Sequence, residues 1–317
     1  MGSVTDREKT CGEPIVNFAP ETVNDWKPAG SRESISVPSP TPAAELDVCV
    51  IEPSRGWQSV NFAEVWHSRE LLARLTLRDI RVRYKQTLLG LGWALVQPLA
   101  TMLVFAVFLG SMGGLSAGIE NYPLFVFAAI LPWTFFSNAL TLSGLSLIQN
   151  QNLVTKVWFP RVLVPLSAIG AALFDFLMGA IFLGAMMARY GIAPGWNLLA
   201  LPLVMGLLMI ASAGLGMLLS ALIVIQRDLR HVLTFGIQIW MFATPCIYLS
   251  DRAMGELSRD LMPLNPAYGL VLNFRNSVLN LPMDWYSLGV SGLVSIALFL
   301  VGSLVFRRVE RRFADVI

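Results

Sequence analysis

The residues able to do chemistry are few and widely spaced. The two histidines, His67 and His231, have no neighbours at metal-ligand spacing. A phosphate-binding loop of the form GxxxxGK[ST] is also missing, because Lys9, the only lysine that precedes Ser or Thr, lacks the glycines. We therefore expect no catalytic residue, no metal and no cofactor in this chain. If the protein uses ATP and Mg²⁺, a separate polypeptide binds them.

Two apolar stretches carry aromatic and polar side chains on one helical face. The first face holds Trp93, Gln97, Thr101, Phe105 and Phe108. The second holds Thr234, Gln238, Met241, Phe242, Pro245 and Tyr248. Amides bond to hydroxyl groups, and aromatic rings pack on the C–H faces of sugars. The two faces suit a glycan path, and ordinary helix packing explains them equally well.

Asp175 is the clear charge in the middle of an apolar run. A coupled transporter normally buries several ionisable groups at such depth. A single carboxylate without a basic partner makes a poor proton relay. We therefore expect Asp175 to bond with neighbouring helices, with a relay as the alternative.

Cations gather immediately before the first long apolar run. Arg74, Arg78, Arg81 and Lys85 follow the spacings of a helical ridge, whereas Asp79 and Arg83 interrupt the opposite, apolar side. A helix with this pattern, joined directly to a membrane span, suits the membrane interface. The alternative is a solvated helix with a charged face.

The composition indicates the class of fold. The chain has 317 residues, of which 55% are hydrophobic and only 14% are charged, and its mean hydropathy is +0.61. A span needs about 20 apolar helical residues. We expect an all-α polytopic membrane protein with six transmembrane helices. The expected spans are 87–110, 122–148, 162–187, 198–225, 232–249 and 286–306.

Lys and Arg residues near the span ends set the orientation. They concentrate at 69–85, 156–161, 227–230 and 307–312, all on one side of the membrane in this assignment. Both termini are therefore expected in the cytoplasm. Residues 1–55, rich in proline and polar residues, are expected to be a mostly disordered extension. The short run 46–51 is the exception, since it could form a strand or dock on a partner.

Two connecting segments stand out. The cytoplasmic loop 150–165 carries Trp158 and Phe159, which suit docking of a partner, with membrane anchoring as the alternative. The outer segment 250–285 is too polar to span, yet Asn265 and Pro266 form a good helix start. We expect short re-entrant helices here, before the last span, that could close an exit.

Five segments of the chain resemble the membrane subunit of ABC-2-type polysaccharide exporters. They are "ELLARLTLRDIRVRYKQTLLGLGWALVQPL" (70–99), "NLVTKVWFPRVLVPL" (152–166), "RDLRHVL" (227–233), "LNPAYGLVLNFRN" (264–276) and the closing "ERRFADVI". The resemblance runs in order from about residue 56 to the end. It implies a six-span homodimer that pairs with two P-loop ATPase subunits in the bacterial inner membrane. The implied substrate is an undecaprenyl-linked polysaccharide such as O-antigen, and relatives export capsule or teichoic acid.

The resemblance also assigns roles to residues. Coupling to the ATPase falls on Asn152, Lys156, Val157, Trp158, Phe159 and Arg161. A gate helix within 56–86 carries Arg74, Arg78, Arg81, Arg83 and Lys85. The channel is lined by Trp93, Gln97, Thr101, Phe105, Phe108, Gln238, Met241, Phe242 and Tyr248. The periplasmic gate is formed by Asn265, Pro266, Tyr268, Phe274 and Arg275.

The expected function is therefore export of a lipid-linked glycan, with membrane lipids and no nucleic acid among the partners. Arg78, Arg81 or Arg83 would bind the carrier pyrophosphate, because a guanidinium pairs with phosphate through two donors. Simple anchoring of the helix is the alternative. Two other functions remain open: export of drugs or small lipids, and a membrane-embedded glycan enzyme. The enzyme would use acidic residues at the outer face, of which the candidates are Asp251, Glu256, Asp260 and Asp284.

Overall fold

The computed structural model describes residues 62–85, 87, 90–108, 121–157, 159–244 and 261–310. The chain divides into two units, Met1–Pro53 and Ser54–Ile317, and every described residue belongs to the second. The expected extension 1–55, together with Trp158 and Tyr248, lies outside the described residues. So do three of the four acidic candidates, Asp251, Glu256 and Asp260.

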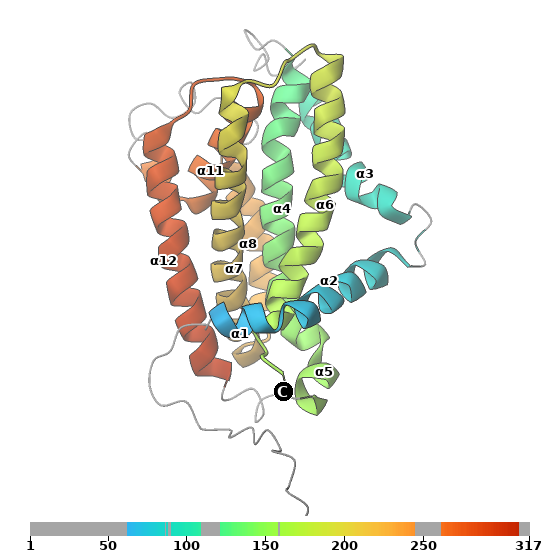
Figure 1. The fold of residues 1–317 in the computed structure, drawn as a ribbon, viewed down its shortest axis with the longest axis vertical. Helices are drawn as coiled ribbons and strands as arrows, with labels where there is room; N and C mark the ends of the chain where they lie inside the picture. The colour runs from blue at the N-terminus through green and yellow to red at the C-terminus, as the bar shows by residue number, and fades with distance from the viewer. Residues whose placement is uncertain are drawn as a thin grey trace, which may run out of the picture. The chain divides into compact units, whose positions relative to one another are not determined.

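The described residues form helices, and four of these are long and apolar enough to cross a membrane. They are α4 (Tyr122–Gln149), α6 (Leu163–Arg189), α7 (Leu201–Ile225) with the preceding turn η3 (Trp196–Ala200), and α12 (Trp285–Glu310). They lie side by side in one bundle (Figure 1). The all-helical fold and several of the expected spans are thus confirmed.

Two shorter helices stand where the first and fifth spans were expected. Helix α3 (Trp93–Phe105) belongs to an apolar stretch, Trp93–Phe108, that is shorter than the expected span 87–110. Helix α8 (Leu229–Ala243) begins before the expected span 232–249, and residues 245–249 lie outside the described part. Among the described residues, the number of full-length apolar helices is therefore four.

Helix α4 is the centre of the bundle. It packs against α6, α7, α3 and α8, and its side chains Leu124, Val126 and Phe136 are fully buried. Aromatic edge contacts join it to its neighbours, with Phe135 on Phe176 of α6 and Phe136 on Trp240 of α8. This burial on all sides explains why α4 reads as a continuous apolar run rather than a narrow stripe.

Glycines allow a close approach between α7 and α12. A Cβ atom on Gly302 would lie 2.0 Å from the carbonyl oxygen of Gly214, and a Cβ on Gly214 would lie 2.5 Å from Phe299 Cα. Small residues let two membrane helices pack backbone to backbone. A larger side chain at either glycine would force these two helices apart.

A short buried helix precedes α12. Helix α11 (Pro266–Val278) follows the turn η4 (Met262–Leu264) and packs against α4, α7 and α12. Asn265 caps it by accepting a hydrogen bond from the Ala267 amide, 3.1 Å away. The predicted helix start at Asn265 and Pro266 is therefore confirmed.

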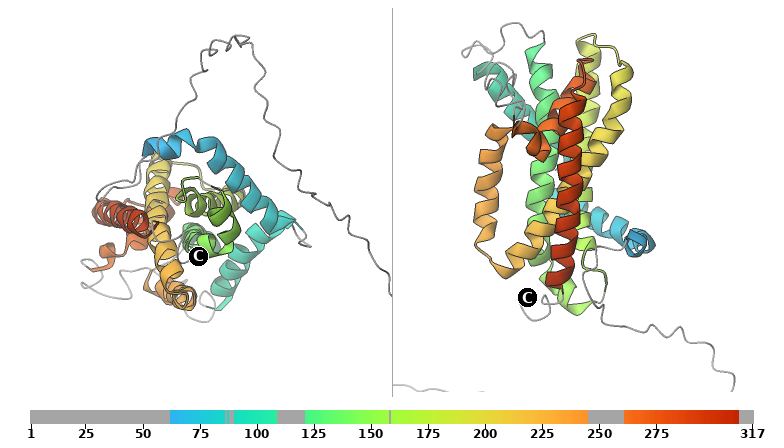
Figure 2. Two further views of the ribbon diagram at one scale, coloured as in Figure 1. Left: turned by 90° about the horizontal axis from the view of Figure 1, so that it is seen from below. Right: turned by 90° about the vertical axis from the view of Figure 1, so that its left-hand side faces the viewer.

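Three helices gather at one end of the bundle. They are α1 (Phe62–His67), α2 (Arg69–Tyr84) and α5 (Gln151–Lys156). Helix α2 crosses α6 from outside, whereas α11 lies toward the opposite end (Figures 1 and 2). The basic helix α2 therefore lies at one end of the long helices, and the short helix α11 lies toward the other end.

Candidate functional site

The crossing of α2 over α6 begins with a close steric fit. Thr76 of α2 lies on Gly170 of α6, where an added Cβ would come within 2.9 Å of the threonine side chain. Among the described side chains of α2, Leu75 is the one that is buried. Asp79 accepts a hydrogen bond from Ser167 Oγ on α6 at 2.9 Å. The inward face of α2 therefore combines small, apolar and acidic groups.

Asp175 of α6 binds two consecutive residues at the end of α2. Arg83 forms an ion pair with its carboxylate, and the Tyr84 hydroxyl donates a hydrogen bond to it. Burial, followed by the hydrogen bond and negative charge of Asp175, raises the pKa of Tyr84 to about 12. The phenol therefore stays protonated at neutral pH and remains a donor.

The expectation that Asp175 bonds with neighbouring helices is confirmed, but its premise was wrong. The carboxylate does have a basic partner, Arg83, which lies 92 positions away in the sequence. Arg83 and Asp79 looked like interruptions of an apolar face. Each instead faces a polar group on α6, so the interruptions are matched contacts.

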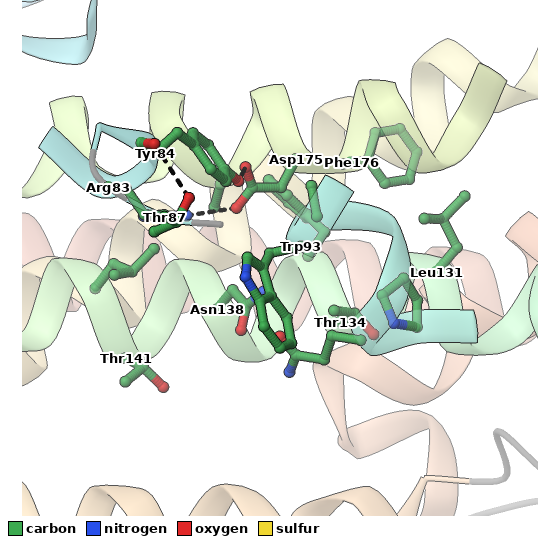
Figure 3. A pocket seen from close by; sticks show the side chains of 16 residues that line it. Arg83, Tyr84, Thr87, Trp93, Leu131, Thr134, Asn138, Thr141, Asp175 and Phe176 are labelled. Carbon is green, nitrogen blue, oxygen red and sulfur yellow. Dashed lines mark hydrogen bonds and ion pairs between the residues drawn. The ribbon is translucent and has the colours of Figure 1, made fainter. Parts of the chain in front are cut away.

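A cavity of about 340 Å³ lies beside this ion pair (Figure 3). The end of α2, the start of α3, the middle of α4 and the middle of α6 enclose it. Its polar and aromatic lining residues are Arg83, Tyr84, Thr87, Trp93, Gln97, Thr134, Phe135, Asn138, Thr141, Asp175 and Phe176. Trp93 stands between Asp175 on α6 and Asn138 on α4 (Figure 3). The cavity therefore has an ion pair at one edge and an indole ring alongside a polar wall.

That polar wall belongs to α4, and its residues were not predicted from the sequence. Thr134, Asn138 and Thr141 follow spacings of four and three, so they share one face of the helix. The signal was present as a polar ridge within an otherwise apolar span. The mean hydropathy of the whole span does not reveal three polar residues on one face.

A second cavity, of about 430 Å³, lies next to the first and shares Arg83 and Leu142 with it. Its polar lining residues are Arg78, Asp79, Arg83, Ser146, Gln149 and Asn150. Arg78 donates to Asp79 at 2.7 Å and to the Asn150 side-chain oxygen at 2.7 Å. The Asn150 amide in turn donates to the Ser146 carbonyl at 2.9 Å, at the end of α4. Arg78 thereby ties α2 to the junction of α4 and α5.

The five basic residues assigned to the gate helix separate into two groups. Arg74, Arg81 and Lys85 are exposed, whereas Arg78 and Arg83 are partly buried and face the two cavities. The ridge expected from spacing thus has one member, Arg78, that reaches inward. Arg69, near the start of α2, lies over the Trp66 ring at 5.3 Å.

The residues expected to line a channel take different positions. Trp93 and Gln97 line the first cavity, while Thr101 bonds to the Gln97 carbonyl at 2.9 Å. Phe105 packs against the core, and Phe108 is exposed. On α8, Met241 packs against the core, whereas Gln238 and Phe242 are exposed. The structure brings Trp93 and Gln97 to Arg83, and it does not bring the α8 residues into that cavity.

The residues assigned to ATPase coupling lie around α5. Asn152, Lys156 and Val157 are exposed. Phe159 is partly buried against a small core cluster that includes Leu147 and Val154. Arg161 Nη1 donates to the Glu310 carbonyl at 2.8 Å, which joins the loop to the end of α12. Among the described members of this set, the exposed ones are therefore Asn152 and Lys156 of α5 and the adjoining Val157.

The residues assigned to the periplasmic gate are part of the bundle core. Pro266, Tyr268, Phe274 and Arg275 are buried, and the Arg275 guanidinium lies 4.2 Å from the Phe125 ring centre. The Asn265 side chain accepts from Trp240 Nε1 at 2.8 Å and donates to Thr244 Oγ1 at 3.0 Å. Asn265 therefore joins the end of α8 to the start of α11.

Asp284 is the one acidic candidate for a glycan enzyme that lies within the described residues. Its two carboxylate oxygens accept from the Ser287 amide at 3.1 Å and the Ser287 hydroxyl at 2.6 Å, which caps α12. Its backbone amide and carbonyl both bond to the Asn273 side chain. The carboxylate thus serves as a cap for α12, and its contacts with described residues are structural.

The fold and the cavities define a multi-pass helical membrane protein with a polar, aromatic site inside its bundle. Residues 70–279, more than half of the chain, match the family model described as ABC-2 type transporter. The chain therefore belongs to the ABC-2 type transporter family.

Curated relatives align over nearly their whole length. The chain is 29% identical over 255 residues to the O-antigen export system permease protein RfbA of Myxococcus xanthus, covering 80% of this chain and 97% of the relative. Two proteins of the same description from Klebsiella pneumoniae are 28% identical over 250 residues, covering 78% of this chain and 95% of each relative.

Proposed function

We propose that this chain is the permease subunit of an ATP-driven exporter that moves a lipid-linked polysaccharide across the bacterial inner membrane. The observation that carries the proposal is the alignment with O-antigen export permeases over 95% or more of their length. The proposed substrate is an undecaprenyl-linked, O-antigen-like glycan.

The proposed motor is a separate P-loop ATPase subunit, because this chain has no phosphate-binding loop of its own. Two copies would pair with a homodimer of the permease. The exposed residues Asn152, Lys156 and Val157 give α5 a surface on which the ATPase would dock. Arg161 would carry the resulting force to α12 through its bond to the Glu310 carbonyl.

The proposed membrane topology has six spans, with α3 and α8 as the first and fifth. Both chain termini would then lie in the cytoplasm, as the distribution of Lys and Arg indicates. Helix α2 would lie at the cytoplasmic interface, with Arg74, Arg81 and Lys85 toward anionic headgroups. Each such cation contributes about 1 kcal/mol of attraction.

The proposed site for the carrier pyrophosphate is the second cavity, beside Arg78. Arg78 donates to Asp79 and Asn150 through its Nε and Nη2 atoms. Nη1 makes no hydrogen bond with any residue that the structure describes and is therefore available to a phosphate oxygen. Arg83 also lines this cavity, but its guanidinium is paired with Asp175, so Arg78 is the main donor in this proposal.

Deleting the gene in its host tests the proposed function. Without the permease, the glycan should accumulate on its lipid carrier inside the cell and disappear from the cell surface. Restoring the full-length gene should reverse both effects. Normal surface glycan in the deletion strain would contradict the proposal.

A further inference from the structure

Two polar side chains on α4 face the first cavity, and neither has a hydrogen-bond partner among the residues that the structure describes. Neither the Thr134 hydroxyl nor the Asn138 side-chain amide forms a hydrogen bond with any residue in the described part of the chain. Other helical threonines differ: the hydroxyls of Thr101 and Thr141 each bond to the carbonyl one turn earlier, at 2.9 Å. Thr134 and Asn138 therefore present uncommitted donors and acceptors to whatever fills the cavity.

The polar groups that line part of the first cavity disfavour lipid tails. An acyl chain would leave the Asn138 amide and the Thr134 hydroxyl without hydrogen bonds, which carries a desolvation cost for each group. Gln97 would add a further unsatisfied amide at the same wall. A ligand that supplies several hydroxyl groups would satisfy all three.

The charges at the edge of the cavity favour a neutral ligand. Arg83 is already paired with Asp175, so this edge presents a neutralised pair rather than a free cation. An anion placed here would meet the Asp175 carboxylate. The polar wall and the ion pair therefore suit an uncharged, hydroxyl-rich group.

Trp93 supplies the remaining feature of a carbohydrate site. Its indole is about half exposed and lines the cavity beside the α4 wall. Sugars offer an apolar C–H face to an aromatic ring and hydroxyls to amides. The volume of about 340 Å³ lies at the small end of typical ligand cavities, roughly 300–1,000 Å³. It suits a ligand of one or two rings.

We propose that this cavity within a single subunit binds the sugar ring next to the carrier pyrophosphate, with Thr134 and Asn138 as its binding residues. This inference rests on the proposed function, because it takes the substrate to be a lipid-linked glycan. The two cavities share Arg83 and Leu142. A pyrophosphate beside Arg78 thus places its attached sugar within reach of the α4 wall.

The test uses two probes, farnesyl pyrophosphate and farnesyl pyrophosphate that carries one hexose. Their affinities are measured for the full-length chain in phosphatidylcholine nanodiscs, and the ratio between the probes gives the contribution of the sugar. Thr134→Val and Asn138→Leu should each lower this ratio by roughly threefold to tenfold, the value of a hydrogen bond. Thr155→Val on α5 is the matched control and should leave the ratio unchanged, because the Thr155 hydroxyl is bonded to the Gln151 carbonyl of its own helix at 2.9 Å and lies outside the lining of both cavities.

The ratio separates failure of the sugar site from failure of the proposed function. Binding of both probes with an unchanged ratio in Thr134→Val and Asn138→Leu would contradict the sugar site alone. Failure of both probes to bind would contradict the substrate class and the sugar site together. Phosphatidylglycerol offers similar hydroxyls, so the ratio is measured again with that lipid present. If phosphatidylglycerol abolishes the difference in affinity between the two probes, the cavity belongs to a lipid headgroup and the proposal is overturned.

Discussion

Arg83, at the end of α2, forms an ion pair with Asp175 in the middle of α6. Both side chains are partly buried, with 28% and 13% of their surface exposed. The pair joins the basic helix to the bundle at the edge of the candidate substrate cavity. Because Tyr84 donates to the same carboxylate, this contact fixes the end of α2 through two consecutive residues.

The ion pair between Arg83 and Asp175 should contribute measurably to the stability of the protein. Arg83→Gln or Asp175→Asn leaves an uncompensated charge, and we expect each to cost roughly 1–3 kcal/mol, below the cost in a fully buried pair. The double variant should cost less than the sum of the two. Thermal unfolding of the purified chain in detergent measures this, and strictly additive effects would contradict a direct interaction.

A larger side chain at Gly170 should separate α2 from α6. Gly170→Leu would overlap Thr76, whereas Gly184→Leu on the same helix is the control, because a Cβ there meets nothing within 4 Å. A reporter cysteine at the buried residue Leu75, in a chain without Cys11, Cys49 and Cys246, measures the separation. The reporter should react quickly with thiol reagents only beside Gly170→Leu. Equal protection in both backgrounds would argue against this packing.

Changes at the exposed end of α5 should weaken docking of the ATPase. Lys156→Glu together with Val157→Asp replaces a cation and an exposed apolar residue, 52% exposed, with carboxylates. Burying such charges in an interface should reduce co-purification of the ATPase by about tenfold or more. Trp196→Ala, at the opposite end of the bundle, is the control. Undiminished co-purification would move the docking surface elsewhere.

Replacing arginine by lysine on α2 should separate phosphate binding from membrane anchoring. Changing Arg78, Arg81 and Arg83 to Lys keeps the charge but loses the paired donors, so export should fall by roughly tenfold or more while membrane insertion persists. Arg74→Lys, on the exposed side of the same helix, should have little effect. Full export from the triple variant would leave these residues only an anchoring role.

The long helices were predictable because the membrane fixes their length. The expected spans 122–148 and 286–306 correspond to Tyr122–Gln149 and Trp285–Glu310 in the structure. Helix α2 and the cap at Asn265 were also predictable, since both depend on residues close together in sequence. Helices α3 and α8 were harder, because a continuous apolar run does not report where a helix ends.

The site depended on contacts between distant parts of the sequence. The spacing of Arg83 identified its face on α2, but its partner lies on another helix 92 positions away. Thr134 and Asn138 form a polar ridge that was hard to recognise because most of the α4 sequence is apolar. The packing of Phe159 against the small cluster near α5 also could not be read from the sequence. Tertiary packing decides each of these positions.

The central claim is ATP-driven movement of a lipid-linked glycan through this chain, and a reconstituted assay tests it most directly. The full-length chain and a P-loop ATPase subunit that assembles with it are placed in proteoliposomes that contain a labelled lipid-linked glycan. An impermeant reagent then measures the glycan on each leaflet. We predict that ATP moves the glycan across the membrane and that Lys156→Glu with Val157→Asp abolishes this movement. An assembled complex that hydrolyses ATP and leaves the glycan on its original leaflet would contradict the account.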